Sequence, residues 1–196
     1  GIIGYTGKSN AVEHIVSGLE ALEYRGYDSA GFAVNINEET KICKCVGSPK
    51  NLKEFTNHYP ADTGIGHTRW ATHGEPSAVN AHPHSSDDAN VIAVHNGIIE
   101  NYQELREKLV KSGYEFKSQT DTEVAVKLVD YYYKKYNEGP VKAIARAMYR
   151  IRGSYALCVM YKDYPGEIYS ACKDSPMFIG IGDVEYYVAS EVRAIL

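Results

Sequence analysis

The segment from Ala156 to Met160 constrains the fold of this chain most strongly, because its residues, Ala-Leu-Cys-Val-Met, are all apolar. A strand with one solvated face alternates apolar and polar residues, whereas a strand covered on both faces is apolar throughout. The segment is too short to cross a membrane as a helix, which needs about 20 apolar residues. We therefore expect a strand that lies between two layers of structure.

Further strand patterns follow one another along the chain and are separated by short polar turns. Residues 37–40 and 163–166, Asn-Glu-Glu-Thr and Asp-Tyr-Pro-Gly, have the composition of hairpin turns, which join antiparallel neighbours. The expected strands cover residues 2–5, 31–36, 41–46, 64–70, 91–95, 114–117, 155–161, 167–171, 177–181 and 186–189. Strands of this number and spacing favour mainly antiparallel sheets.

Apolar residues at helical spacing predict five helices, three of them in the middle of the chain. The expected helices cover residues 12–22 and 51–57, and begin at Asn101, at Thr120 and after Pro140. Asn101 and Thr120 are each followed by a Glu three positions later, which is the spacing of a capping box. This arrangement predicts an α+β sandwich, sheet against sheet with helices outside, rather than a doubly wound parallel sheet.

Length and charge narrow the class of protein. The 196 residues fit one domain, or at most two small ones, and the apolar ending suggests that a further domain follows. The net charge is −4 and the basic residues are scattered, so no nucleic-acid partner is expected. No apolar run predicts a membrane span or a signal peptide. The four cysteines show no extracellular disulfide spacing, and we expect reduced thiols and a cytoplasmic location.

Polar chemistry concentrates first at the end of the strand expected at residues 64–70. Arg69, Trp70, Thr72 and His73 follow one another there, where the strand enters a Gly- and Pro-containing loop. Loops at strand ends carry many binding sites, and an arginine can hold a carboxylate with two parallel hydrogen bonds. The alternative is a surface loop with a solvated arginine and a half-buried tryptophan.

A second candidate is the pair Asn96–Gly97, which follows an apolar strand. An asparagine amide and the next backbone N–H can point at one spot and form an oxyanion hole, in which each donor contributes about 3 kcal/mol in acyl transfer. The alternative is an ordinary Asn-Gly turn.

A third candidate is Asp121, in the first turn of the helix that begins at Thr120. Its carboxylate could accept the ammonium group of a ligand. The alternative is that it only complements the helix dipole, which contributes a few tenths of a kcal/mol.

Two further groups are expected to be structural. His82 and His84 are two residues apart, but two histidines without a third ligand do not make a zinc site. Cys43 and Cys45 share one face of a strand and are expected to be core thiols. No metal and no cofactor is therefore expected.

Five sequence blocks together resemble the class II glutamine amidotransferases, in particular the glutaminase domain of the glucosamine-6-phosphate synthases. The resemblance covers essentially all of residues 1–196. The blocks are Gly1-Ile2-Ile3-Gly4, Leu22 to Gly31, Gly66 to His84, His95 to Asn101, and Thr120-Asp121-Thr122-Glu123. The sequence Trp-Ala-Thr-His at 70–73 favours the sugar-phosphate branch over the purine, asparagine and glutamate branches, which stay open as alternatives.

The resemblance implies a four-layer α-β-β-α fold of the N-terminal-nucleophile type. It implies that Asn96 and Gly97 stabilise the tetrahedral oxyanion of glutamine hydrolysis. It also implies that Arg69 binds the α-carboxylate of glutamine and that Asp121 binds its α-ammonium. Trp70, Thr72 and His73 are expected to line the pocket.

In this family the nucleophile is an N-terminal cysteine whose own α-amine acts as the base. The resemblance places that cysteine directly before Gly1 and places Arg25 beside it, ordering the site. No internal cysteine can replace it, because the thiol and the amine must belong to one residue. A chain that lacks this cysteine and binds glutamine without cutting it is the alternative of a different class.

The resemblance also implies partners. These are the substrate glutamine and C-terminal sugar isomerase domains, which this chain does not contain, in a full-length enzyme expected to be a homo-oligomer. The loop at residues 72–83 is expected to close over bound glutamine.

Overall fold

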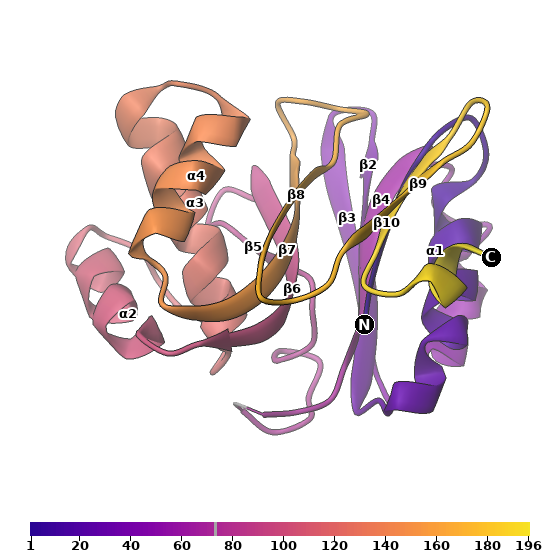
Figure 1. Cartoon of the computed structure of the whole chain (residues 1–196), viewed down its shortest axis with the longest axis horizontal. Helices are drawn as coiled ribbons and strands as arrows, with labels where there is room; N and C mark the ends of the chain where they lie inside the picture. The colour runs from indigo at the N-terminus through magenta and orange to yellow at the C-terminus, as the bar shows by residue number, and fades with distance from the viewer. Residues whose placement is uncertain (73) are drawn as a thin grey trace.

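The computed structural model describes residues 1–72 and 74–196 and shows four layers, helix, sheet, sheet and helices (Figure 1). Helix α1 (Ala11–Ala21) covers the outer face of one sheet. Helices α2 (Tyr102–Lys111), α3 (Asp121–Tyr136) and α4 (Pro140–Arg150) lie on the far side of the other sheet. The α+β sandwich and the four-layer arrangement expected from the sequence are confirmed.

The sheet beside α1, here called sheet A, is antiparallel and has the strand order β3-β2-β4-β1-β10-β9. Its strands are β1 (Ile2–Thr6), β2 (Ser29–Ile36), β3 (Glu39–Val46), β4 (Thr63–Arg69), β9 (Phe178–Ile181) and β10 (Tyr186–Ala189). β1 lies between β4 and β10, so the start of the chain is central in this sheet. The expected hairpin at residues 37–40 is confirmed, because β2 and β3 pair across it.

The second sheet, sheet B, is also antiparallel and has the order β5-β6-β7-β8. Its strands are β5 (His84–Ser85), β6 (Val91–Ile99), β7 (Gly153–Tyr161) and β8 (Tyr169–Lys173). The expected hairpin at 163–166 is confirmed by the pairing of β7 with β8. The described residues also include three short 3-10 helices, η1 (Glu23–Arg25), η2 (Pro49–Phe55) and η3 (Val192–Ile195).

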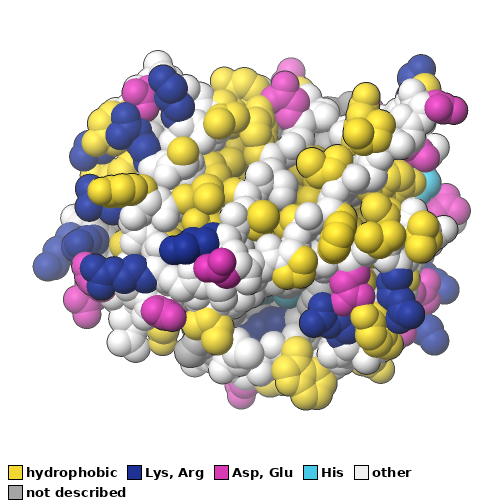
Figure 2. All heavy atoms as spheres, viewed as in Figure 1, with side chains coloured by type: hydrophobic (Ala, Val, Ile, Leu, Met, Phe, Trp, Pro, Cys, Tyr) yellow, Lys and Arg dark blue, Asp and Glu magenta, His cyan; other side chains and the backbone are white. Residues whose placement is uncertain are grey.

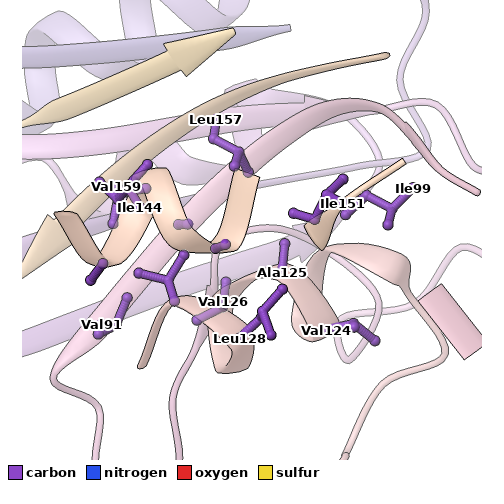
Figure 3. Packing of buried hydrophobic residues seen from close by; sticks show 14 of the residues in the cluster. Val91, Ile99, Val124, Ala125, Val126, Leu128, Ile144, Ile151, Leu157 and Val159 are labelled. Atoms are coloured by element: carbon purple, nitrogen blue, oxygen red, sulfur yellow. The ribbon is translucent and has the colours of Figure 1, made fainter. Parts of the chain in front are cut away.

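The apolar strand β7 lies between two layers, as its sequence predicts. Ala156, Cys158 and Met160 pack with sheet A in the cluster between the sheets. Leu157 and Val159 point the other way, into the cluster under α3 and α4 that Figure 3 shows. Because both faces of β7 are covered, every position of its centre can be apolar without exposing hydrophobic surface.

Two expectations about local structure are wrong. Residues 114–117 form a loop rather than a strand, and the N–H of Lys117 donates to the Glu123 carboxylate instead of to a neighbouring strand. Asn101 does not cap α2, because its side chain donates to Arg150 O and accepts from Arg152 N. Thr120 does cap α3, accepting from the N–H of Glu123.

The outer surface is mixed in character. Within the described residues no helix has the length and apolar content needed to cross a membrane. Figure 2 shows hydrophobic side chains on the part of the surface formed by β9 and β10, where Ile179, Ile181 and Tyr186 are exposed. The cysteines among the described residues are free thiols, and Cys43 is buried in the core, as expected.

Candidate active site

A pocket of about 380 Å³ opens where the two sheets meet the N-terminus of α3. Sheet A contributes the end of β4 and the start of β1, and sheet B contributes the centre of β6. The lining residues are Gly1, Arg25, Gly26, His67, Thr68, Arg69, Trp70, Thr72, His82, His95, Asn96, Gly97, Thr120, Asp121, Thr122, Ser175, Pro176 and Ser190. Every described residue that the sequence singled out for the site therefore borders one cavity.

Gly1 lies against the end of β4. Its α-amino nitrogen donates to Thr68 O at 2.8 Å, and the N–H of Thr68 donates to Gly1 O at 3.0 Å. These bonds continue the antiparallel pairing of β1 with β4, in which Ile2 faces His67. The first residue of the chain is thereby fixed at the edge of the pocket.

Arg69 is the last residue of β4 and is buried, with 5% of its surface exposed. Its guanidinium donates to Gly74 O at 3.0 Å and to Glu75 O at 3.3 Å, which ties the following loop to the strand. Burial lowers the pKa of Arg69, and the carboxylates of Asp28 and Asp121 oppose that shift. The alternative of a solvated surface arginine is therefore wrong.

The residues after Arg69 form the rim. Trp70 is 65% exposed and its ring lies over Gly26, where an added Cβ would come within 2.6 Å of the ring. Gly26 also has a φ of 96°, a region that favours glycine. Thr72 is exposed at the pocket mouth, and His73 lies outside the described residues.

Arg25 also lines the pocket. Its guanidinium pairs with Glu191 at 2.5 Å, and Tyr24 donates to the same carboxylate. Asp28 then links this segment to the rim, because its carboxylate accepts the N–H of Ala71 at 2.7 Å. The sequence analysis did not single out Asp28 as a site residue, although it lies inside the Leu22-to-Gly31 block.

Asn96 and Gly97 lie inside β6, so the alternative of an Asn-Gly turn is wrong. Gly97 has a φ of 111°, and a Cβ there would overlap the carbonyl oxygen of Ser154 on β7. Only glycine fits this position, and it exposes the backbone of β6 at the pocket. The Asn96 side chain points toward sheet A, where its Oδ1 lies 3.0 Å from His67 Nε2.

Asp121 stands at the first position of α3 and is 6% exposed. Its Oδ2 accepts the N–H of Ile99 at 2.9 Å, so the carboxylate joins the helix N-terminus to the end of β6. A role limited to the helix dipole would not need this contact or this burial.

Buried histidines lie beside one another at the site, and they were not expected from the sequence as a group. His82 stacks on His67 with ring centroids 3.9 Å apart, and Thr122 bonds both His82 and His95. His82 and His84 are two residues apart, but His67 and His95 lie on separate strands, so no spacing in the sequence indicates that these rings come together. His84 bonds Thr120 at 3.0 Å.

The described residues contain no group of three or more side chains suited to hold a metal ion. His82 and His84 are instead engaged by Thr122 and Thr120. The residues that line this pocket can supply hydrogen bonds together with one buried cation, Arg69, and one buried anion, Asp121.

Comparison with known sequences gives a consistent result. Residues 67–196 match the glutamine amidotransferase domain family. The glutamine–fructose-6-phosphate aminotransferases (isomerizing) of Clostridium tetani and Clostridium perfringens are 48% and 50% identical to the chain over its whole length. That of Pyrococcus horikoshii is 47% identical. The chain spans about a third of the length of these curated relatives, 32% for the two from Clostridium and 33% for the third.

Solved structures agree. The glutamine phosphoribosylpyrophosphate amidotransferase of B. subtilis, complexed with ADP and GMP, superposes with a TM-score of 0.84 at 25% identity. A structure described as the allosteric regulatory enzyme of purine biosynthesis gives 0.85 at 26% identity. Each match covers 99% of this chain and 42% of the other chain.

Proposed function

We infer the reaction from one premise: the chain belongs to the glutamine amidotransferase domain family. We propose that it is a glutaminase domain, which hydrolyses the side-chain amide of glutamine to glutamate and ammonia. The observation that carries this proposal is that buried Arg69 and buried Asp121 border one pocket together with Asn96–Gly97. A zwitterionic amino acid needs one cation and one anion to bind its two charged α groups.

The roles follow from the chemistry of each group. The Arg69 guanidinium, which here donates to two carbonyls, binds the α-carboxylate of glutamine through charge-assisted hydrogen bonds. The Asp121 carboxylate binds the α-ammonium. Trp70 and Thr72 form the rim around the substrate. The proposed part of His73 in this wall concerns a residue outside the described ones.

The pairing of β1 with β4 supports a place for the nucleophile. Gly1 and Thr68 bond each other, so a residue preceding Gly1 would lie opposite Arg69, at the pocket. We place there the thiol of a cysteine directly before Gly1, with its free α-amine as base. Arg25 lies on the same side of the pocket, paired with Glu191, and would order this end of the site.

In the first half of the reaction the thiolate sulfur attacks the side-chain amide carbon of glutamine, and the carbonyl π electrons move to oxygen. The Asn96 amide and the Gly97 N–H donate to this oxyanion. The proton from the thiol passes through the α-amine to the amide nitrogen, and the C–N bond breaks to release ammonia. In the second half water attacks the resulting thioester, glutamate leaves, and the thiol is restored.

The use of the ammonia belongs to the full-length protein. We propose that C-terminal sugar isomerase domains use it to convert fructose 6-phosphate to glucosamine 6-phosphate, in a cytoplasmic homo-oligomer. The support is that the relatives at 45 to 50% identity are named glutamine–fructose-6-phosphate aminotransferases. The phosphoribosylpyrophosphate amidotransferase and the enzyme of purine biosynthesis share only 25% and 26% identity with the chain.

Release of glutamate and ammonia from glutamine tests the proposal. Residues 1–196 are prepared with a cysteine before Gly1 and a free α-amine, and a matched protein carries alanine at that added position. We expect glutamate and ammonia in equal amounts from the first protein and none from the second.

Binding measured on the same two proteins separates the alternatives. Glutamine binding by the cysteine-bearing protein without any turnover would favour the silent glutamine-binding module. Turnover by the alanine-bearing protein would contradict the assigned nucleophile.

A further inference from the structure

A contact between two side chains joins the two sheets at the pocket, and the proposed function gives it no role. His67 on β4 and Asn96 on β6 meet with Nε2 and Oδ1 3.0 Å apart. His67 is 3% exposed, and Asn96 borders the pocket directly. The contact therefore decides which end of the Asn96 amide faces the pocket.

Two arrangements of protons satisfy this contact. In one, His67 Nε2–H donates to Asn96 Oδ1, and the NH₂ group of Asn96 is turned toward the pocket. In the other, the amide is reversed, its NH₂ donates to Nε2, and its oxygen faces the pocket. The neutral imidazole must then carry its proton on Nδ1.

The surroundings of His67 Nδ1 distinguish the two. The backbone of His95 lies near the ring, yet this buried nitrogen makes no hydrogen bond of ordinary geometry. A buried N–H donor without a partner is rarer and costlier than an unfilled acceptor. The arrangement with the proton on Nε2 avoids an orphaned donor, so it is the favoured one.

The histidine network keeps His67 in place and neutral. The ring of His82 is nearly parallel to that of His67, at 13°, and covers it at 3.9 Å. His82 cannot turn, since its Nδ1 accepts the N–H of His95 and its Nε2 bonds Thr122 Oγ1. Burial lowers the pKa of both rings well below the usual range. The α-ammonium of Gly1 further opposes a charge on His67, and His67 opposes a charge on His82.

We propose that His67 is a positioning residue: as the neutral Nε2–H tautomer it holds the Asn96 carbonyl, so that the Asn96 NH₂ faces the pocket as a ready donor. The donor is then oriented before any negative charge develops on the substrate oxygen. This inference rests on the proposed function for its effect on turnover, but the orientation itself is a property of the resting protein.

Substitution in the cysteine-bearing protein tests the effect on turnover. His67→Leu removes the donor and should lower kcat about 10- to 100-fold, less than the loss of the Asn96 donor itself. The KM for glutamine should stay within about threefold of its value in the unsubstituted protein, since the groups that bind the substrate before reaction are unchanged. His67→Gln places an amide N–H near the position of Nε2 and should restore most of the activity.

A double variant separates positioning from a general loss of structure. If His67 acts through Asn96, the variant His67→Leu/Asn96→Ala should be no slower than Asn96→Ala alone. Multiplied losses in the double variant, or full activity of His67→Leu, would overturn the proposal.

Nitrogen NMR on residues 1–196 reads the tautomer without any catalysis and in the unsubstituted protein. Long-range ¹H–¹⁵N correlations should show the His67 proton on Nε2, and His67→Leu should shift the Asn96 NH₂ resonances. A proton on Nδ1 would overturn the inference whether or not glutamine is hydrolysed. Absence of hydrolysis with the proton on Nε2 would instead count against the proposed function alone.

Discussion

At the scale of single residues, the proposed roles of Arg69 and Asn96 differ, and steady-state kinetics can distinguish them because one affects KM and the other kcat. In the proposed mechanism, Arg69→Ala removes hydrogen bonds made equally to substrate and transition state, so KM should rise about 10- to 100-fold. In the same mechanism, Asn96→Ala removes a donor to the oxyanion, so kcat should fall about 100- to 1000-fold. Steady-state kinetics of the cysteine-bearing protein measures both, and reversed effects would reject the assignment.

Arg69 also holds Gly74 O and Glu75 O, so its loss could loosen the rim as well as the substrate. Asn80→Ala is the matched control, because Asn80 bonds the same Glu75 O but does not border the pocket. If both variants raise KM equally, the loop rather than the guanidinium accounts for the change.

The buried histidines predict a loss of stability in acid. Burial and the charge of Lys44 lower the pKa of His84 to about 3, although Glu123 opposes the shift. The pKa of a histidine in the unfolded chain is about 6.5, so as pH falls the unfolded chain takes up this proton before the folded protein does. The contribution of the neutral His84 ring to the free energy of unfolding is fully present above pH 6.5. It is lost at about 1.4 kcal/mol per pH unit as pH falls toward 3.

Urea unfolding at pH values between about 6 and 4 measures this slope. His84→Gln should reduce it by about 1.4 kcal/mol per pH unit. An unchanged slope in His84→Gln would show that this ring is already protonated in the folded protein.

The sequence located the candidate residues but could not show how they are held. Arg69 and Asn96 carry a local signal, since each stands at a strand position unusual for its type, whereas Asp121 stands in a first helical turn, where acidic residues are common. The contact of His67 with Asn96 depends on how β4 faces β6 across two sheets. No spacing in the sequence encodes that register.

At the scale of elements, the N-terminus of α3 is organised by a buried ion pair. Glu123 and Lys127 are 2.7 Å apart, with side chains 5% and 2% exposed. Glu123 also accepts the N–H groups of Lys117 and Ser118. Burial alone would raise the pKa of Glu123, but these partners lower it to about 2.

Glu123→Ala should therefore lower the free energy of unfolding by about 3 to 5 kcal/mol, because it removes the buried carboxylate that pairs with the buried Lys127 ammonium and leaves only the pair with the more exposed Asp87. Chemical denaturation measures the change. Glu104→Ala breaks the exposed pair with Lys108 on α2 and should cost under about 1 kcal/mol. Equal effects of the two variants would contradict the importance of burial.

Contacts between elements also explain two expectations from the sequence that are wrong. Residues 114–117 alternate like a strand, yet their backbone is satisfied in part by the Glu123 carboxylate, which no local pattern reveals. The spacing at Asn101 satisfied the capping-box rule, but Asn101 is bound by the end of α4. In both places a tertiary partner replaced the local one.

At the scale of the whole molecule, the pocket needs both halves of the sandwich. Sheet A supplies Arg69 and His67, whereas sheet B and α3 supply Asn96 and Asp121. The apolar residues of β7 predicted this contact between the sheets, because they required cover on both faces. They could not predict which strand ends would meet at the pocket.

We propose that residues 1–196 unfold as one cooperative unit, since the cluster between the sheets joins them. Ile65→Ala, at a position that is fully buried in this cluster, should lower the free energy of unfolding by about 2 to 5 kcal/mol. Trp70 fluorescence reports on the end of sheet A, and hydrogen exchange of α4 amides reports on the outer helices. Both probes should shift to the same lower denaturant midpoint, as one transition requires.

Val110→Ala, on the exposed face of α2, is the control. It should change the free energy of unfolding from either probe by no more than about 0.5 kcal/mol. Protection of α4 that persists after Trp70 reports unfolding would mean that the two halves fold separately, and that the pocket is assembled only when they dock.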